Sequence, residues 1–441
     1  MTTAKPTRTR PERLRSSLDL EAVRACFPSL NMELKGRPVV FLDNPGGTQT
    51  PREVIEAVRS YYLEMNANQG GSFKTSQDTD AMVEEARRAL ADMLNAASPG
   101  EIVLGANMTT LTMHMSRCLA RELNPGDEVV VTRLDHDANI SPWLLVAEDR
   151  GAVVRWVDFD PSDCTIDMRA FAQAITERTK LVAVGYASNA TGTITDIEGV
   201  VKLAHGAGAL VYVDAVAFAP HRSIDVQQLN CDFLVCSAYK FYGPHVGILY
   251  GKTEHLERIS ACKLRPAPAT PPGKFETGTL NLEGIAGTLA AVNYLAGIGQ
   301  RYGRAHEPRH QGFAGRRMRL RTAFDVITEH EQELVAAMIE AVAGHQGVRI
   351  YGITDPNRFV ERVPTVSFTW GERPPADLAA ALGREGMFAW SGNYYALATM
   401  DFLGLEQSGG MVRVGAAHYN TLQEIERLHD GLGRAGRAVR G

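Results

Sequence analysis

The sequence predicts an α/β protein, in which a mostly parallel sheet is covered by helices on both faces and is followed by a smaller α+β domain. Over the first 300 residues, short β-branched runs alternate with helical patterns, as expected when helices join successive parallel strands. Several of these runs are apolar throughout, which is typical of strands buried on both faces. After about residue 300 the alternation gives way to a long charged helical pattern and separate strand candidates.

Seven apolar runs are predicted as strands of the large sheet. They lie at residues 101–105, 128–132, 152–157, 181–186, 209–214, 232–237 and 246–251. Two helices are predicted before them, at residues 51–65 and 78–96, where apolar residues recur at three- and four-residue spacing.

The C-terminal part is predicted to begin with one long helix over residues 301–342. Strands are expected within residues 348–352, 365–370 and 411–418, followed by one helix near the end, and residues 429–441 are expected to form a frayed or solvated tail. The predicted division of the chain is an N-terminal arm (1–30), a large domain (31–300) and a small domain (301–441). The last has about 140 residues, an ordinary domain size.

The first sixteen residues are polar and basic, without the apolar stretch of a secretory signal peptide. A transit peptide is the alternative that the arginines allow. Glu12 and the missing hydrophobic face argue against it.

Composition limits the class of function. The chain has 441 residues, 44% hydrophobic and 22% charged, with a formal net charge of −5, the profile of an ordinary globular protein. An acidic chain lacks the clustered Lys and Arg of nucleic acid binders, and no run approaches the roughly 18 apolar residues of a membrane helix. Six scattered cysteines form no CxxC pair, which argues against a structural metal site or a disulfide framework. We therefore expect a cytoplasmic enzyme without a nucleic acid partner, a membrane segment or a metal.

Lys240 and Asp214 are the first candidate catalytic residues. Asp214 ends one predicted strand, and Lys240 follows the next, inside the turn Ser-Ala-Tyr-Lys-Phe-Tyr-Gly-Pro. Ligands of open α/β sheets bind outside the carboxyl ends of strands, where both residues lie. Apolar and aromatic neighbours desolvate the lysine, which lowers its pKa and makes the amine a nucleophile. The alternative is a surface lysine at a strand end.

Polar residues follow other predicted strands as well. Thr109 lies where a helix opens, so that backbone N–H groups there could hold a phosphate, although a plain helix N-cap by Thr109 is the alternative. His136 follows the second strand, where a flat imidazole could lie over a planar ring. The alternative is a metal cluster of Asp135, His136 and Asp137, but three adjacent residues rarely converge on one ion. Asn189 follows another strand and offers a hydrogen-bond donor.

Six short motifs occur in an order and at separations typical of one enzyme family. They are DHDAN, SNATG, VDAV, CSAYKFYGP, FETGTLN and MVRVGAAHYN. Together they resemble the class V aminotransferase superfamily of fold-type I pyridoxal phosphate (PLP) enzymes, and in particular its cysteine-desulfurase-like branch. The resemblance extends from residue 42 to residue 428. It implies a PLP cofactor, a homodimer and the fold predicted above.

The resemblance implies a role for each catalytic candidate. Lys240 resembles the family's Schiff-base lysine, which joins the PLP aldehyde and moves protons during turnover. Asp214 would pair with the pyridine nitrogen, because a nearby carboxylate favours the protonated ring that serves as an electron sink. His136 would stack on the ring, and Asn189 would hydrogen-bond its phenolic oxygen. Arg413 would clamp the substrate α-carboxylate with its planar guanidinium fork.

The resemblance also implies a phosphate site. Thr109, the neighbouring backbone of Asn107 and Met108, and Ser237 would hold the phosphate. Thr279, in the segment FETGTLN, would be contributed by the partner subunit.

The chain departs from the desulfurase pattern at three positions. Family members carry a reactive cysteine on a loop before the carboxylate-binding arginine, whereas Tyr395 matches that position here and no cysteine follows Cys262. Ala217 stands where the family has Gln or His bonded to the phenolic oxygen, and Tyr239 stands where desulfurases have His. Loss of one hydrogen bond changes the local energetics by about 1 kcal/mol. A persulfide mechanism is therefore not expected.

We expect a PLP enzyme acting on an L-α-amino acid, by carbon–sulfur β-lysis of cysteine or a cysteine S-conjugate. Transamination, epimerisation, and decarboxylation followed by oxidative deamination use the same residues, so these alternatives stay open. A PLP-binding protein without turnover is another alternative, but a binding module has no need of Arg413. Tyr395 is expected to contact substrate, and Trp390 and Tyr394 in the same loop either line the pocket or pack the small domain.

Overall fold

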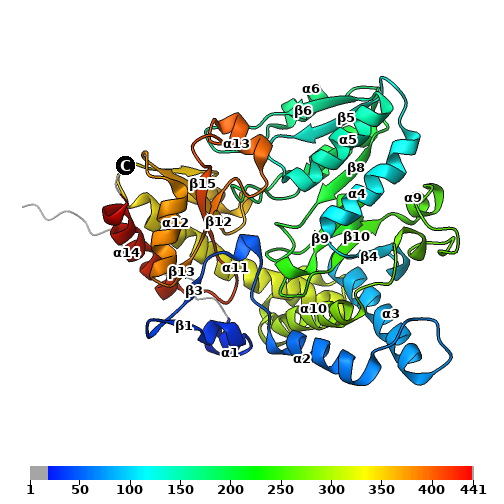
Figure 1. Cartoon of the computed structure of the whole chain (residues 1–441), viewed down its shortest axis with the longest axis horizontal. Helices are drawn as coiled ribbons and strands as arrows, with labels where there is room; N and C mark the ends of the chain where they lie inside the picture. Colours follow the sequence, from blue (N-terminus) through cyan, green and yellow to red (C-terminus); the bar gives the residue numbers. More distant parts are fainter. Residues whose placement is uncertain (1–17, 440–441) are drawn as a thin grey trace, which may run out of the picture.

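The computed structural model describes residues 18–439. The basic segment at residues 1–16, with its targeting alternatives, lies outside the described residues. The two largest sheets have seven and four strands, and helices pack around both (Figure 1). The predicted α/β class is confirmed.

The seven-stranded sheet contains all seven strands predicted from the apolar runs. In sequence order these are β4 (Ile102–Gly105), β5 (Glu128–Thr132), β6 (Val153–Val157), β7 (Thr179–Gly185), β8 (Leu210–Asp214), β9 (Phe233–Ser237) and β10 (Gly247–Gly251). Their spatial order is β4-β10-β9-β8-β7-β5-β6, and β10 runs antiparallel to both neighbours. Because β5, β7, β8 and β9 are parallel, their carboxyl ends meet at one edge, where ligands of such sheets bind.

Side-chain alternation divides the core between the two faces of this sheet. On β9, Leu234 and Cys236 belong to one hydrophobic cluster, and Phe233 and Val235 belong to another. Every residue of β9 is buried, which explains why its sequence is apolar without alternation. The first cluster includes residues of α1 (Leu20–Ala25), α3 (Lys74–Leu94), α6 (Met168–Ala174), α7 (Ile197–Gly206), α8 (Val226–Leu229) and α10 (Leu282–Tyr302). The second includes residues of α4 (Met108–Leu119), α5 (Ser141–Arg150) and α9 (Thr253–Arg258).

The helix predicted over residues 51–65 is α-helical at first and π-helical after Ser60. It begins as α2 (Arg52–Ser60), which packs against α10, and continues as one π-helical turn, η3 (Tyr61–Met65). The helix predicted over residues 78–96 is α3, which begins four residues earlier than expected.

The four-stranded antiparallel sheet forms the core of the C-terminal part. Its order is β11 (Val348–Tyr351), β12 (Thr365–Trp370), β15 (Met411–Gly415) and β14 (Trp390–Gly392). It shares a hydrophobic cluster with α11 (Gly315–Ala343), α12 (Pro375–Arg384) and α14 (Leu422–Ala438). The cluster also contains Val40 and Leu42, because β3 (Val40–Phe41) pairs with β13 (Met387–Phe388). Figure 1 shows this blue segment beside the C-terminal helices. The division at residues 30 and 300 stays a prediction.

The single helix predicted over residues 301–342 is wrong. α10 ends at Tyr302, a 3-10 segment η9 (Arg304–His310) follows, and α11 begins at Gly315. Pro308 lies inside this break, and proline lacks the N–H group that a continuous α-helix needs. The break lets α10 and α11 pack against each other.

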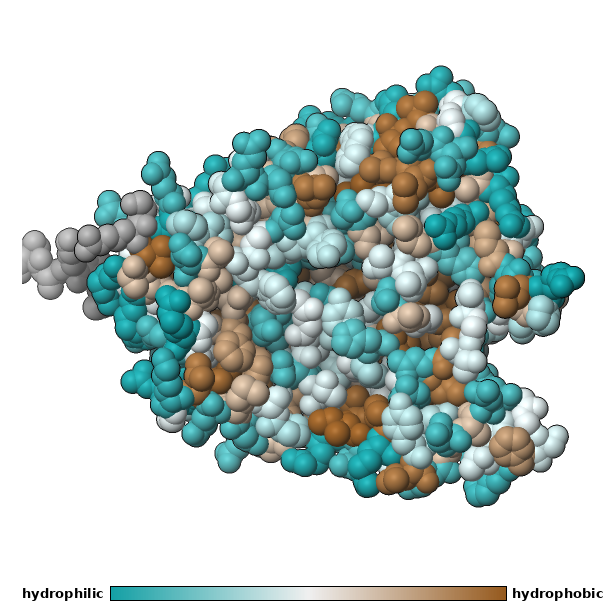
Figure 2. Space-filling model, viewed as in Figure 1, coloured by the Kyte–Doolittle hydropathy of each residue, from teal (hydrophilic) through white to brown (hydrophobic). Residues whose placement is uncertain are grey.

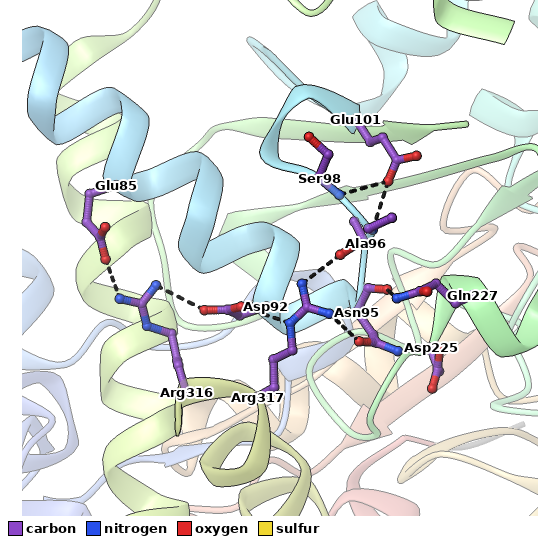
Figure 3. A network of polar contacts seen from close by, with 11 residues as sticks. Glu85, Asp92, Asn95, Ala96, Ser98, Glu101, Asp225, Gln227, Arg316 and Arg317 are labelled. Carbon is purple, nitrogen blue, oxygen red and sulfur yellow. Dashed lines mark hydrogen bonds and ion pairs between the residues drawn. The ribbon is translucent and has the colours of Figure 1, made fainter. Parts of the chain in front are cut away.

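Arginines at the start of α11 fix this helix against the end of α3 (Figure 3). Arg316 forms ion pairs with Glu85 and Asp92. Arg317 donates to Asp92 at 3.0 Å and to the Asn95 side chain at 2.6 Å. Two arginines of the charged segment therefore form tertiary contacts between α11 and α3.

The frayed tail expected over residues 429–441 is wrong for its described part. α14 continues to Ala438 and buries Leu432 and Ala435. A capping box between Thr421 and Glu424 stabilises its start. Because the apolar residues recur on one face, the Gly- and Arg-rich end packs as an amphipathic helix rather than extending into solvent.

No helix within residues 18–439 is long and apolar enough to cross a membrane. On the face in Figure 2, hydrophobic residues form several separate groups among hydrophilic ones. The exposed large hydrophobic residues include Trp390 and Tyr395.

Candidate active site

A cavity lies at the edge where the carboxyl ends of the parallel strands meet. Its volume is about 60 Å³. It is lined by Met108, Thr109, His136, Gly185, Ala187, Asn189, Asp214, Val216, Ala217, Tyr239 and Lys240. Six of the site residues proposed from the sequence therefore meet here, together with the two departures at positions 217 and 239.

Lys240 ends the short turn η7 (Ala238–Lys240), which directly follows β9. Its Nζ donates to the Pro45 carbonyl and lies 5.0 Å from the centre of the Tyr239 ring. Burial, and then the charge of Arg413, lowers the pKa of the amine to about 7, although Asp214 acts in the opposite direction. A neutral, nucleophilic amine is therefore abundant near neutral pH.

Two buried carboxyl groups lie beside each other near the cavity. Asp214 ends β8, and its Oδ1 accepts from the Val216 N–H at 2.9 Å. Asp135 accepts from the Gly185 N–H at 2.6 Å and from Asn139 Nδ2 at 3.1 Å. Burial raises the pKa of Asp214 to about 6. Burial and the Asp214 charge raise that of Asp135 to about 8. A cationic ligand atom at Asp214 would bring its pKa back down.

His136 presents a neutral aromatic surface. It precedes η6 (Asp137–Asn139), and its Nδ1 accepts from the Ala138 N–H at 3.0 Å, so the proton of the neutral ring lies on Nε2. Burial, followed by the charges of Lys240 and Arg413, lowers its pKa to about 4. A neutral flat ring suits stacking on a planar ligand.

The metal cluster that was the alternative for this loop is not assembled. Asp135 is bonded to Gly185 and Asn139, and Asp137 accepts from Ser141 Oγ at 2.6 Å. Within residues 18–439, no group of three His, Cys, Asp or Glu side chains could hold a metal ion.

The start of α4 can bind an anion. Its N-cap is Asn107 rather than Thr109, because Asn107 Oδ1 accepts from the Thr110 N–H at 2.9 Å. The Met108 N–H donates to Ser237 Oγ at 3.0 Å. Since the first N–H groups of a helix have no intrahelical acceptor, the N–H of Thr109 stays available at the cavity lining, where the helix dipole also favours negative charge.

Arg413 and Asn189 bind each other beside the cavity. Arg413 lies on β15 and is 5% exposed, and its Nη1 donates to the Asn189 carbonyl at 2.8 Å. Asn189 Nδ2 donates to the Tyr394 carbonyl at 2.9 Å, and the guanidinium lies 4.2 Å from the centre of the Tyr394 ring. Arg413 Nε and Asn189 Oδ1 are buried without a partner among the described residues. Such groups are uncommon and costly, so both are suited to meet a ligand.

Tyr395 contacts His136, one of the residues that line the cavity. Its ring stacks on His136, with a centroid distance of 5.7 Å and an interplanar angle of 10°, and the side chain is 72% exposed. Its carbonyl accepts from the Asp137 N–H at 2.7 Å. The loop that leads to α13 (Leu397–Leu403) therefore reaches the segment that carries His136.

Three residues proposed for the phosphate are not among those that line this cavity. Ser237 is buried, and its Oγ accepts from the Met108 N–H. Asn107 acts as the helix cap. Thr279 is exposed between η8 (Gly273–Phe275) and α10. Because the structure contains one chain, the contribution of Thr279 to a partner subunit stays a prediction.

None of the six cysteines, all of which lie within the described residues, lines the cavity. Burial raises the pKa of Cys118, Cys164 and Cys231 to about 12. Cys236, which precedes Ser237 on β9, is also buried, and its pKa is raised too. Because the thiolate is the nucleophilic form, these thiols are inert at neutral pH.

Sequence reasoning did not propose three residues that contact the site. Asp135 was considered only as a metal ligand. Its position shortly after an apolar strand could have predicted that it lies at the ligand site. Pro45 contacts Lys240 through its carbonyl. Asp43 interacts electrostatically with Arg413. Pro45 and Asp43 come from a segment about 200 residues before Lys240, and no local pattern marks them.

The chain is similar to several characterised groups of proteins. The family model described as Aminotransferase class-V matches residues 40–321 and 315–428. The aminotransferase-like protein FGM3 of Gibberella zeae is 34% identical over 428 residues, covering 94% of this chain and 97% of that protein. A cysteine desulfurase of Pectobacterium atrosepticum is 31% identical, with coverages of 96% and 99%.

Two solved structures share the fold over nearly the whole chain. The cysteine desulfurase CsdA (S-sulfonic acid) from Escherichia coli has a TM-score of 0.80 at 28% identity, covering 96% of this chain and 100% of that chain. The apo structure of a cysteine desulfurase from Thermococcus onnurineus NA1 has a TM-score of 0.82 at 28% identity, with coverages of 95% and 98%.

Proposed function

The chain belongs to the class V aminotransferase family and is a PLP-dependent enzyme related to cysteine desulfurases, and on this premise we propose that it breaks the carbon–sulfur bond of cysteine or a cysteine S-conjugate by β-lysis. The observation that carries the proposal is that none of the six cysteines lines the cavity, whereas Tyr395 stacks on His136, which does line it. Persulfide formation needs a thiolate beside the substrate sulfur. β-Lysis needs a base, a carboxylate clamp and an electron acceptor.

The residues of the cavity fit PLP. The Thr109 N–H and hydroxyl, together with Ser237, would hold the phosphate at the start of α4, and Asp214 would hold the ring N–H. Lys240 presents a desolvated amine for the aldehyde, and His136 presents a flat neutral surface for the ring. The unpartnered Asn189 side chain lies at the same cavity. When bound, PLP supplies an aldehyde that condenses with amines and a protonated ring that accepts an electron pair.

Residues of the chain would bind the substrate and remove its α-proton. Arg413 would bind the α-carboxylate through the donors that are free in this structure, and Asp43 and Tyr394 fix its orientation. Lys240 would remove the proton from Cα, since about half of its amine is neutral at pH 7 and most of it above that pH. The β-substituent leaves as a thiol, and the carbon skeleton is released as pyruvate and ammonia after one water is added.

The homodimer with Thr279 at the partner's site is part of the proposal. Dimerisation is typical of this family, and Thr279 is exposed in the segment before α10. A solution mass of one chain for the holoenzyme would contradict it.

The proposed function is tested by incubating the holoenzyme with an S-alkyl-L-cysteine and measuring pyruvate, free thiol, keto acid and CO₂ separately. Pyruvate and thiol in equal amounts are expected. Keto acid that forms only with an amino acceptor present indicates transamination, and CO₂ release indicates decarboxylation. Racemised substrate indicates epimerisation, and no product with any amino acid indicates a binding protein; each result contradicts β-lysis.

Replacing Arg413 by Lys is expected to raise KM for the amino acid about 10-fold, and replacing it by Ala to lower kcat/KM by about 10²-fold. A charge-assisted hydrogen bond contributes about 1.5–3 kcal/mol, and Lys keeps the charge but loses the fork. Steady-state kinetics of the purified variants provide the measurement. Arg349→Ala on β11, which is separated from β15 by β12 in the same sheet, is the matched control. An unchanged KM in Arg413→Lys would remove the clamp role.

The pKa of about 7 for Lys240 predicts how the apoprotein takes up PLP. Only the neutral amine attacks an aldehyde. The folded-state pKa of Lys240 lies below the usual value for lysine. The fraction of Lys240 that is a neutral amine therefore rises around pH 7 rather than around pH 10. We expect the rate at which the bound-cofactor absorbance appears to rise about 10-fold between pH 6 and pH 8. A rate that still rises in proportion to hydroxide above pH 9 would show an ordinary lysine.

A further inference from the structure

Tyr395 is held in an unfavourable backbone conformation that exposes its ring. Tyr394 and Tyr395 have φ values of 55° and 58°, in the left-handed region that non-glycine residues avoid. Two consecutive residues of this kind persist only when the surroundings hold them. The side chain of Tyr395 remains 72% exposed, so burial of the ring does not account for the conformation.

The contacts that hold this loop come from the candidate site itself. Asn189 Nδ2 donates to the Tyr394 carbonyl at 2.9 Å, and the Asp137 N–H donates to the Tyr395 carbonyl at 2.7 Å. The Tyr394 hydroxyl donates to the Met411 carbonyl. The loop is thus anchored to the segments that carry Asn189 and His136. The result is a stacked pair in which the rings of Tyr395 and His136 are nearly parallel.

Trp390 provides a second exposed aromatic surface near this pair. It is 53% exposed and is the direct cross-strand partner of Arg413 on β15, so both side chains lie on one face of the sheet. Its indole nitrogen would be only 2.6 Å from a Cβ at Gly46, the residue after Pro45, whose carbonyl accepts from Lys240. Trp390 therefore lies between the carboxylate clamp and the segment that contacts the lysine.

We propose that Tyr395 is a specificity-determining residue and that, with Trp390, it selects amino acids whose sulfur carries a flat aromatic group. The inference rests on the proposed function and names its substrate class. Arg413 would fix the α-carboxylate beside Trp390, so a group on the sulfur extends toward the Tyr395 ring. Stacking between flat rings is favourable beyond the area that they bury, whereas a saturated ring of the same size gains only burial. Ala217, small where the family has a larger residue, leaves space at the same cavity.

The test compares S-benzyl-L-cysteine with S-(cyclohexylmethyl)-L-cysteine, two ligands of similar size that differ in flatness. Each is titrated into the holoenzyme, and Kd is read from the change in the visible band, which does not depend on β-lysis. We expect the wild type to bind the benzyl compound about 10-fold more tightly, the effect of one to two aromatic stacks. A ratio near one in the wild type would overturn the proposal.

Variants assign the preference to the Tyr395 ring. The ratio of the Kd for the cyclohexylmethyl compound to the Kd for the benzyl compound is expected to fall below about 2 in Tyr395→Ala. The ratio is expected to persist in Tyr395→Phe, which keeps the ring. Leu397→Ala, at a 42% exposed position that starts α13 two residues after Tyr395, is the control and should keep the ratio. A ratio that persists in Tyr395→Ala, or that is lost in Tyr395→Phe, contradicts the proposal.

A second variant covers the case in which Tyr395→Ala does not fold. Trp390→Ala is expected to lower the ratio, and an unchanged ratio there contradicts the shared aromatic surface. If the preference is present but no pyruvate forms, the proposed β-lysis fails while the specificity stands. If pyruvate forms without a preference, the specificity fails alone.

Discussion

Replacing Lys240 by Ala is expected to lower turnover by at least about 10³-fold, because it removes both the amine that holds the cofactor and the base at Cα. The amine lies at the cavity, where burial lowers its pKa to about 7. No other lysine lines this cavity. The measurement is kcat with an S-alkyl-L-cysteine, together with borohydride treatment followed by peptide mass analysis. The cofactor should become linked to the Lys240 peptide in the wild type and to no peptide in the variant.

Two controls separate this effect from a folding defect. Lys202→Ala removes an exposed lysine from α7 and should leave kcat unchanged. Added methylamine should partly restore the Lys240→Ala rate, because a small amine fits the space left by the side chain. Cofactor that remains linked to another lysine would contradict the assignment.

Replacing Asp214 by Asn is expected to lower kcat by about 10²- to 10³-fold, the usual effect of removing one preorganised charge from a reaction site. The carboxyl group ends β8 and is 7% exposed. Asn keeps its shape but cannot favour the protonated ring nitrogen. KM should change much less, because Asp214 does not bind the substrate carboxylate. Steady-state kinetics and the visible spectrum of the holoenzyme provide the measurement.

The apoprotein of Asp214→Asn should be at least as stable as the wild type above pH 6. Burial raises the pKa of Asp214 to about 6, so the folded state holds the proton more tightly than the unfolded state. The ionised carboxylate therefore destabilises the fold as pH rises through that value, and Asn removes this cost. A thermal unfolding midpoint at pH 8 reports it. Asp158→Asn, at a 59% exposed side chain, is the matched control. An unchanged kcat would remove Asp214 from its role.

Strand prediction succeeded because the large sheet is buried on both faces. The run at residues 128–132 is apolar apart from its ends and coincides with β5 of that sheet. The run at residues 365–370 coincides with β12 of the four-stranded sheet, which is also mostly buried. Helix prediction failed where tertiary contacts replaced local pattern. Arg316 and Arg317 were expected within one long charged helix over residues 301–342, whereas they lie at the start of α11 and join it to α3. The glycines near the C-terminus suggested fraying, yet α14 packs there.

The residues of the site were likewise predicted where a local pattern marks them and missed where only the fold brings them together. Asp214, Lys240, His136 and Asn189 were identified because each lies at or shortly after the carboxyl end of a strand of the parallel sheet, and parallel strands bring their carboxyl ends together. Pro45 was not identified, because its contact with Lys240 spans 195 positions and leaves no local signal.

The sequence alone determined the fold class, the order of strands in the chain and the family, because burial on both faces and short motifs after strands are local properties. Only the tertiary structure decided that Arg413 meets Asn189, that Asp135 lies beside Asp214, and that Tyr395 stacks on His136. These contacts join residues from separate strands and loops. The pKa values of Lys240, Asp214 and His136 depend on the same packing, since burial and neighbouring charge exist only once the chain has folded.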